Sequence, residues 1–212
     1  MKASLNDIDF EIKIFVGGAH LLKRFGKTID AIKSDGFTNI STIAYLKEDD
    51  DTSSDFAHSY YRAVKQFVDV LDDNQPDFVF ILGDRWEMLA LATSASLLGI
   101  PIAHVEAGLR TDDIKEPFPE EANRRLISQI ATLHFAPTNA SKDNLLNSGI
   151  TGNIIITGNT VIDALIYIAK KTEKEKMVNM PLDNDNFILA TIHRRENWGE
   201  PLKNICKGFK LI

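Results

Sequence analysis

Short runs rich in apolar and β-branched residues alternate along the chain with longer segments of helical periodicity, and this alternation restricts the fold more than any other feature. Between residues 53 and 72, apolar side chains recur at spacings of three and four, which is typical of a helix with one buried face. Strands that are separated by single helices run parallel, with right-handed crossovers. The sequence therefore predicts an α/β protein with a doubly wound parallel sheet. The expected strands are residues 11–16, 39–45, 77–82, 101–105, 133–136, 153–157 and 187–192.

Ionisable residues follow three of these expected strands. The run 77–82 is almost wholly apolar after its first residue, as expected of a parallel strand that is covered on both faces. In a doubly wound sheet the carboxyl ends of the strands lie along one edge, and ligands bind there. Asp84, Glu106 and His193 follow their strands directly or after one glycine. We therefore expect these three side chains at a functional site on this edge.

Two of these residues also have purely structural interpretations. Asp84 precedes a helix expected over residues 85–98, and aspartate is a favoured N-cap. Glu106 ends an apolar strand where no capping geometry accounts for it, so an ion pair with Arg110 is its structural alternative. Both interpretations stay open for Asp84, whereas the functional one is preferred for Glu106.

The segment 104–124 combines carboxylates, guanidinium groups and turn-forming residues. Burying a charged side chain is costly unless it forms an ion pair or binds a ligand, so the high density of charged residues in this segment indicates a site for a charged ligand. Within the segment, Glu120 and Glu121 follow Pro119 in the first turn of an expected helix, where their charges complement the helix dipole. For Glu121 we prefer this structural interpretation, and we assign Glu120 to the candidate site.

The composition argues against several classes of protein. A formal net charge of −6 and the absence of basic runs give no footprint for nucleic acid or for a membrane surface. The one cysteine, Cys206, excludes an internal disulfide, and the pair His104 and Glu106 has no third ligand at metal-like spacing. His134, within an apolar run, is predicted as a core histidine. We expect a cytoplasmic protein without a metal or another cofactor.

A polar stretch separates the last expected strand from the rest of the chain. Residues 170–176 and 181–186 are the best linker candidates, so we expect a first domain over 1–176 and a second over 186–212. One strand and part of a helix cannot bury a core, which makes the second domain incomplete. The chain is therefore expected to be a piece of a longer protein.

Five separated motifs, in order over nearly the whole chain, resemble the UDP-N-acetylglucosamine 2-epimerase family. They are HVEAGLRT at 104–111, PFPEEANR at 117–124, FAPT at 135–138, TGNTVIDAL at 157–165 and HRRE at 193–196. The resemblance implies two Rossmann-like domains arranged as in GT-B glycosyltransferases, with the sugar nucleotide in the cleft between them. This chain would supply most of the first domain and the start of the second, and the complete protein is expected to be a homodimer that acts on a UDP-sugar.

The resemblance also implies a reaction and roles for residues. Members of the family eliminate UDP to give a 2-acetamidoglucal and then add UDP back, so that the configuration at carbon 2 is inverted. Asp84, Glu106 and Glu120 match the acid/base carboxylates, and His193 matches the histidine of the catalytic site; which carboxylate removes the proton stays open. The expected substrate-binding residues are Arg110, Asn159, Arg194 and Arg195. Asn159 and Arg110 have structural alternatives, as a turn residue and as a supporting residue.

Two parts of the chain favour different branches of the family. The segment 83–88 (GDRWEM) and residues 17–37 are similar to the hydrolysing branch, which releases UDP and free N-acetylmannosamine. The segment 104–111 is similar to the non-hydrolysing branch, which we prefer. Ala19 stands where bacterial non-hydrolysing enzymes have a glutamine used in activation by substrate, so such activation is not implied here. A diacetamido UDP-sugar as the substrate, and an inactive sugar-nucleotide-binding fragment, are the remaining alternatives.

Overall fold

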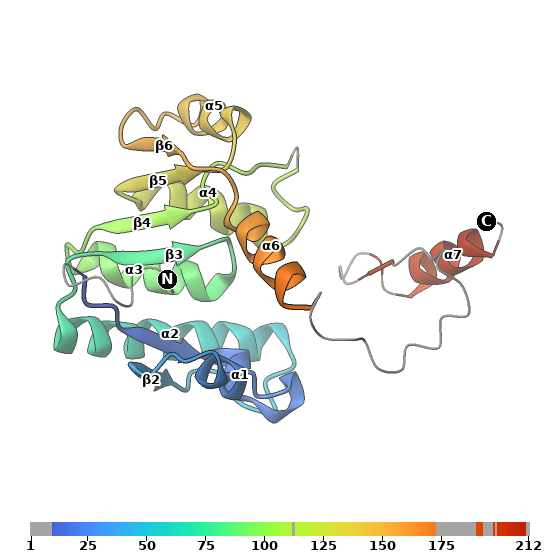
Figure 1. Ribbon diagram of the computed structural model, residues 1–212, viewed down its shortest axis with the longest axis horizontal. Helices are drawn as coiled ribbons and strands as arrows, with labels where there is room; N and C mark the ends of the chain where they lie inside the picture. Colours follow the sequence, from blue (N-terminus) through green and yellow to red (C-terminus); the bar gives the residue numbers. More distant parts are fainter. Residues whose placement is uncertain (1–9, 112, 173–189, 193–196, 198, 211–212) are drawn as a thin grey trace. The chain divides into compact units, whose positions relative to one another are not determined.

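The computed structural model describes residues 10–111, 113–172, 190–192, 197 and 199–210 (Figure 1). By its internal packing the chain divides into two units, Met1–Asn159 and Thr160–Ile212. The domain limits expected from the sequence, 1–176 and 186–212, stay a prediction.

The first unit contains two parallel sheets (Figure 1). Strands β1 and β2 form one sheet, and β3, β4, β5 and β6 lie side by side in chain order in the other. Every pair is parallel, so the carboxyl ends of β3 to β6 share one edge. This arrangement confirms the predicted α/β class with parallel strands. The bounds are β1 Ile14–Gly17, β2 Ile40–Ile43, β3 Val79–Leu82, β4 Ile102–Val105, β5 Leu133–Ala136 and β6 Ile154–Ile156.

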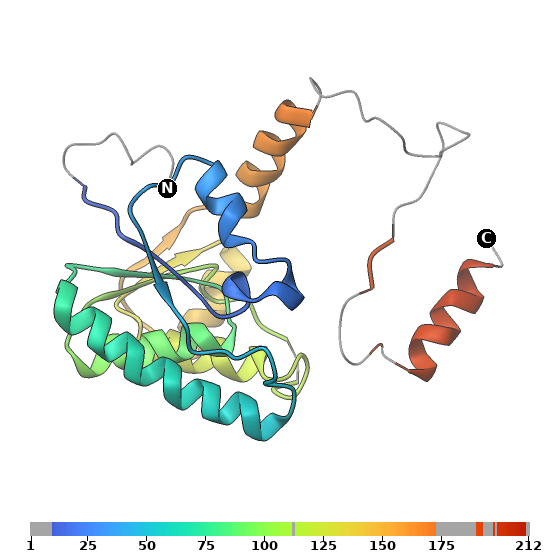
Figure 2. The ribbon, with the colours of Figure 1, turned by 90° about the horizontal axis from the view of Figure 1, so that it is seen from below.

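Helices connect the strands, as the change of hydrophobic period predicts. In the first unit they are η2 Gly18–Leu21, η3 Lys23–Phe25, α1 Ile29–Ser34, α2 Ser53–Asn74, α3 Trp86–Leu97, α4 Glu120–Ile130 and α5 Asn139–Asn147. Helix α2 packs on α3, and α3 packs on α4. Figure 2 shows these three helices together on one side of the β3–β6 sheet. The core between them contains Ile81, Ile102 and Ile127, none of which is more than 1% exposed.

The two faces of β3 differ in burial. Val79 and Ile81 are buried against the helices, whereas Phe80 and Leu82 are 66% and 56% exposed. The ring of Phe80 stacks on Phe135 of β5. The expectation that this strand is covered on both faces is therefore wrong within the described residues, because α2, α3 and α4 all lie on the same side. An apolar run of this length does not report how many faces are covered.

The long helix α2 shows how local sequence sets an element. Thr52, its N-cap, accepts a hydrogen bond from the backbone N–H of Asp55, and the Asp55 carboxylate accepts one from the backbone N–H of Thr52. This reciprocal capping box satisfies backbone donors that have no partner within the helix. At the other end, Gln75 adopts a left-handed conformation that stops the helix.

The second unit contains α6, Thr160–Thr172, and α7, Glu200–Phe209. Of the strand expected over residues 187–192, residues 190–192 are not in a strand, and the others lie outside the described residues. Every helix that the structure describes is too short or too polar to cross a membrane.

Gly108 allows helix α5 to approach the loop after β4. Its φ is +83°, and a Cβ added there would lie 2.1 Å from the carbonyl oxygen of Ser141. We expect Gly108→Ala to lower the free energy of unfolding by about 3 kcal/mol or more, because it combines left-handed strain with a clash against backbone. Chemical denaturation measures this loss.

Gly99 provides the matched control. Its φ of +71° is similar, but nothing lies within 4 Å of an added Cβ. Gly99→Ala should therefore cost only the strain, about 1–2 kcal/mol. Equal losses for the two variants would contradict the close approach of α5.

Candidate functional site

The carboxyl edge of the four-stranded sheet brings Asp84 and Glu106 together. Leu82, the last residue of β3, is in register with Val105, the last residue of β4. The N–H of Gly83 continues this pairing by donating to the carbonyl of Val105 over 3.2 Å. An oxygen of the Glu106 carboxylate lies 3.9 Å from the position of a Cβ on Gly83. Two carboxylates from distant parts of the sequence thus border the same turn.

The backbone of Glu106 is strained. Its φ is +64°, in the left-handed region that residues other than glycine, asparagine and aspartate seldom adopt. Such a conformation costs of the order of 1–3 kcal/mol and is found preferentially at functional sites, where the surrounding structure enforces it. Here the next N–H, that of the buried Ala107, donates to the carbonyl of Phe135 in β5. The sheet therefore fixes the direction in which Glu106 leaves β4.

Arg110 does not hold the carboxylate of Glu106. Its guanidinium donates to the carbonyl of Leu109 over 2.8 Å and to the hydroxyl of Ser128 over 3.4 Å. No ion pair joins Glu106 to another residue in the described part of the chain. The structural alternative considered for Glu106 is therefore wrong, and its carboxylate remains available for other contacts. Arg110 itself is half-buried beside the C-terminal half of α4.

Asp84 is anchored by helix α4. Its carboxylate forms an ion pair with Arg124, whose Nε and Nη2 both donate to Oδ2. The side-chain amide of Asn123 donates to the backbone carbonyl of Asp84 over 2.9 Å. The N-cap of α3 is Arg85, and no side chain caps this helix end. The capping interpretation of Asp84 is therefore wrong, because its carboxylate binds Arg124 instead.

Glu121 lies beneath this ion pair and is completely buried. Its carboxylate accepts hydrogen bonds from Arg124 Nη1 at 3.0 Å, Arg125 Nε at 2.6 Å and the backbone N–H of Thr111 at 3.1 Å. Glu121 does lie in the first turn of α4, as the sequence predicts, but its main contacts are these three. The sequence did not reveal this network, although a glutamate three residues before an arginine on a helix was a signal for it.

Arg85 adds a cation next to Asp84. Its guanidinium donates twice to the buried carboxylate of Glu87, at 3.1 Å and 2.6 Å, yet the Arg85 side chain is 64% exposed. The hydrogen bonds that Arg85 donates to Glu87 raise the pKa of Arg85, and the charge of Glu120 at the start of α4 contributes to the same rise. The sequence singled out Arg85 only as a marker of the hydrolysing branch.

Asn159 and the motif at residues 193–195 are the remaining predicted site residues. Asn159 is half-buried and lies three residues after β6, directly before α6. His193, Arg194 and Arg195 lie outside the described residues. Their assignment to the site stays a prediction.

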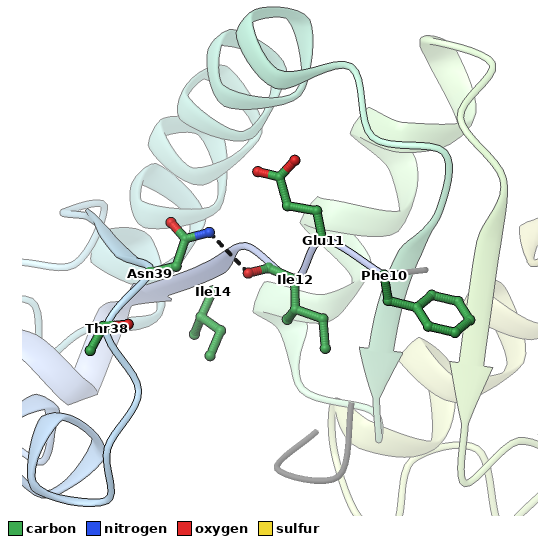
Figure 3. Close-up of a pocket in the computed structure, with 6 residues that line it drawn as sticks. All are labelled: Phe10, Glu11, Ile12, Ile14, Thr38 and Asn39. Carbon is green, nitrogen blue, oxygen red and sulfur yellow. Dashed lines mark hydrogen bonds between the residues drawn. The ribbon is translucent and has the colours of Figure 1, made fainter. Parts of the chain in front are cut away.

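A pocket of about 240 Å³ lies elsewhere in the first unit (Figure 3). It is next to the amino ends of β1 and β2, where the side chain of Asn39 donates to the carbonyl of Ile12 over 3.0 Å. Its lining contains none of the predicted site residues: Phe10, Glu11, Ile12, Ile14, Thr38 and Asn39. The carboxyl edge of the other sheet remains the better candidate, because it brings carboxylates and cations together, whereas the lining of this pocket has one carboxylate, Glu11, and no cation.

Removing the charge of Glu121 should be costly. We expect Glu121→Gln to lower the free energy of unfolding by about 3 kcal/mol or more, because it leaves Arg124 without its buried counter-ion. Asp69→Asn is the control, since Asp69 pairs with Lys65 at 2.9 Å on the exposed face of α2 and should cost at most about 1 kcal/mol. Denaturation curves that coincide for the two variants would refute a structural role for the buried pair.

His104 should make stability depend on pH. Burial lowers the pKa of His104 from its ordinary 6.5 to about 4. Between these pH values the unfolded chain binds a proton at His104 that the folded chain does not. The free energy of unfolding therefore has its full value above pH 6.5 and decreases as the pH falls towards 4. The expected loss is about 3 kcal/mol.

Urea denaturation at a series of pH values measures this dependence. His104→Gln should flatten it, whereas His58→Gln, which replaces an exposed histidine, should leave it unchanged. A pH dependence that survives His104→Gln in full would show that other groups cause it.

The chain matches a known family over almost its whole length. The family model described as UDP-N-acetylglucosamine 2-epimerase matches residues 2–212. A UDP-N-acetylglucosamine 2-epimerase of Neisseria meningitidis serogroup A is 47% identical over 150 residues, which cover 67% of this chain and 40% of the relative. This chain thus spans about 40% of the length of the curated relatives that it matches.

Solved structures give the same result. A crystal structure of a Listeria monocytogenes protein assigned as this epimerase has a TM-score of 0.79 at 33% identity, covering 95% of this chain and 51% of the other. A crystal structure of a UDP-GlcNAc 2-epimerase from Neisseria meningitidis bound to UDP-GlcNAc has a TM-score of 0.66 at 35% identity, covering 76% of this chain and 42% of the other. With its carboxylates at the carboxyl edge of a parallel sheet, the chain belongs to the UDP-N-acetylglucosamine 2-epimerase family.

Proposed function

We propose that the complete protein interconverts UDP-N-acetylglucosamine and UDP-N-acetylmannosamine by eliminating UDP and adding it back. The observation that carries this proposal is the placement of Asp84 and Glu106 at the ends of adjacent strands β3 and β4. Membership of the family and the relative that binds UDP-GlcNAc support the choice of substrate. The homodimer and the cytoplasmic location expected from the sequence belong to the same proposal.

The reaction needs a base at carbon 2 and stabilisation of the leaving group. A carboxylate takes the proton from carbon 2 while the bond between carbon 1 and the diphosphate oxygen breaks. The electrons of that bond leave with UDP, and a double bond forms between carbons 1 and 2. In the return step, UDP adds to carbon 1 and a carboxylic acid delivers a proton to the opposite face of carbon 2.

The candidate carboxylates differ in what holds them. Glu106 has no ion pair with another described residue, so its oxygens are available to accept the proton from carbon 2. Asp84 is fixed by Arg124, which provides a second carboxylate in a defined position for the return of a proton. Glu120, at the first position of α4, is the third group in this proposal.

Cations should stabilise the leaving diphosphate. Arg85 presents an exposed guanidinium next to Asp84 and is oriented by the buried carboxylate of Glu87. Arg194 and Arg195 are assigned to the diphosphate on the resemblance of their motif, and His193 to the catalytic site. Arg110 and Asn159 complete the proposed set of substrate-binding residues.

Substitution of the two carboxylates tests their roles. In the full-length protein, Glu106→Gln and Asp84→Asn should each lower kcat by at least about 10²-fold, because general acid–base groups contribute this much or more. Asp69→Asn, on the exposed face of α2, should leave turnover unchanged. Near-native turnover by Glu106→Gln, with folding intact by circular dichroism, would remove Glu106 from the mechanism.

The products in deuterated water separate the two branches of the family. Elimination and re-addition should return both UDP-sugars with deuterium at carbon 2. Hydrolysis, which the resemblance of segment 83–88 favours as the second candidate, would instead accumulate UDP and free N-acetylmannosamine. Nuclear magnetic resonance of the reaction mixture distinguishes the two outcomes directly.

A further inference from the structure

The two peptide carbonyls of the Gly83–Asp84 turn each accept a hydrogen bond from a buried side chain. The imidazole Nε2 of His104 lies 2.9 Å from the carbonyl oxygen of Gly83, and the side-chain amide of Asn123 lies 2.9 Å from that of Asp84. His104 belongs to β4, two residues before Glu106, and Asn123 belongs to α4, next to Arg124. The turn with Asp84 is thus held by side chains from β4, which Glu106 follows, and from α4, which Glu120 begins.

The geometry defines which nitrogen of His104 holds the proton. A carbonyl oxygen only accepts hydrogen bonds, so Nε2 must donate, and neutral imidazole then carries no proton on Nδ1. The Nδ1 atom is buried and has no hydrogen-bond partner within the described residues. His104 is 1% exposed and Asn123 is 5% exposed, so water does not compete for either contact. The bond to Gly83 is therefore the one polar anchor of this ring in the described structure.

The clamped turn has a backbone that would otherwise be free to vary. Gly83 has a φ of +78°, a conformation in which glycine has no Cβ to restrict it. The N–H of Gly83 donates to Val105, and Asn123 and His104 hold the two following carbonyls. The bonds to the carbonyls of Gly83 and Asp84 therefore fix the peptide planes on both sides of the Asp84 Cα, and the bond from the N–H of Gly83 fixes the plane before them.

We propose that His104 and Asn123 are positioning residues that set the place of the Asp84 carboxylate relative to Glu106. This inference rests on the proposed function, because it assigns both carboxylates to the same reaction. His104 acts from the strand that bears Glu106, so a single ring ties the two strand ends together. Neither residue touches the substrate; each acts through the turn. Misplacing a reacting group by about 1 Å can cost about 10²-fold in rate.

His134 offers a closely matched control. It lies in register with His104 on the neighbouring strand β5, is 2% exposed, and its Nε2 is 2.9 Å from the carbonyl oxygen of Ser128. Its Nδ1 is likewise buried without a hydrogen-bond partner among the described residues. The sequence predicted His134 as a core histidine, and its burial agrees. The two histidines thus share burial and bonding, but only His104 binds the Asp84 turn.

The experiment compares His104→Phe, His104→Gln, Asn123→Leu and His134→Phe in the full-length protein. Steady-state kinetics with UDP-N-acetylglucosamine give kcat and KM, urea denaturation gives stability, and amide hydrogen exchange gives the local opening of residues 82–86. Asn123→Leu removes the second anchor without touching the histidine, and so keeps the test decisive if His104→Phe fails to fold.

We expect His104→Phe and Asn123→Leu to lower kcat by about 10- to 100-fold with KM changed less than about threefold, and to speed exchange at residues 82–86 by about tenfold. His104→Gln should restore most of kcat, because a glutamine amide can donate to the same carbonyl. His134→Phe should lower the free energy of unfolding by about as much as His104→Phe does. Its kcat and the exchange rates of residues 82–86 should stay those of the unmodified protein.

Two results would overturn the proposal. One is an equal loss of kcat in His104→Phe and His134→Phe, which would mean that stability alone is responsible. The other is unchanged exchange at residues 82–86 in both His104→Phe and Asn123→Leu. If the unmodified protein does not turn over the UDP-sugar, the proposed function is wrong, while the exchange measurement still decides whether His104 and Asn123 hold the turn.

Discussion

The buried carboxylate of Glu121 is the contact on which the geometry of the site depends. It holds Arg124 on helix α4, and Arg124 in turn binds Asp84 at the end of β3. The same carboxylate accepts the N–H of Thr111, which places the loop after β4 against the start of α4. A buried charge is tolerated only with such partners, so removing any one of them exposes the others to an uncompensated desolvation cost. One glutamate thereby connects three segments that carry candidate catalytic residues.

Backbone conformation adds the second constraint. Gly83 and Glu106, which follow adjacent strands, both have positive φ, and the carboxylate of Glu106 lies near Gly83. The strain at Glu106 is offset by the ordered sheet below it, where His104 and the N–H of Ala107 make their hydrogen bonds. This arrangement is consistent with a preorganised site, in which groups are held in place before the substrate binds.

The strands, their parallel pairing and the position of Asp84 and Glu106 were predictable, because they depend on local sequence patterns. Hydrophobic period located the strands β1 to β6 to within a few residues, and the order of strands and helices predicted parallel pairing. Asp84 and Glu106 were expected at one edge for the same reason. The partners of these residues were not predictable, because Arg124 reaches Asp84 across forty positions of sequence and a capping role for Asp84 was equally compatible with its neighbours. Likewise, the apolar run of β3 did not reveal that Phe80 and Leu82 are exposed.

The class of fold, the family and the sheet edge with Asp84 and Glu106 can be predicted from the amino-acid sequence, because periodicity and motif spacing are properties of neighbouring residues. Which charges pair depends instead on the folded arrangement. In the folded chain Glu121 lies in the interior, and Glu106 has no described counter-ion. Both His104 and His134 lie on apolar strands, but it is His104 that binds the carbonyl of Gly83, whereas His134 binds that of Ser128. Such choices follow from burial and from the approach of distant segments, and these exist only once the chain has folded.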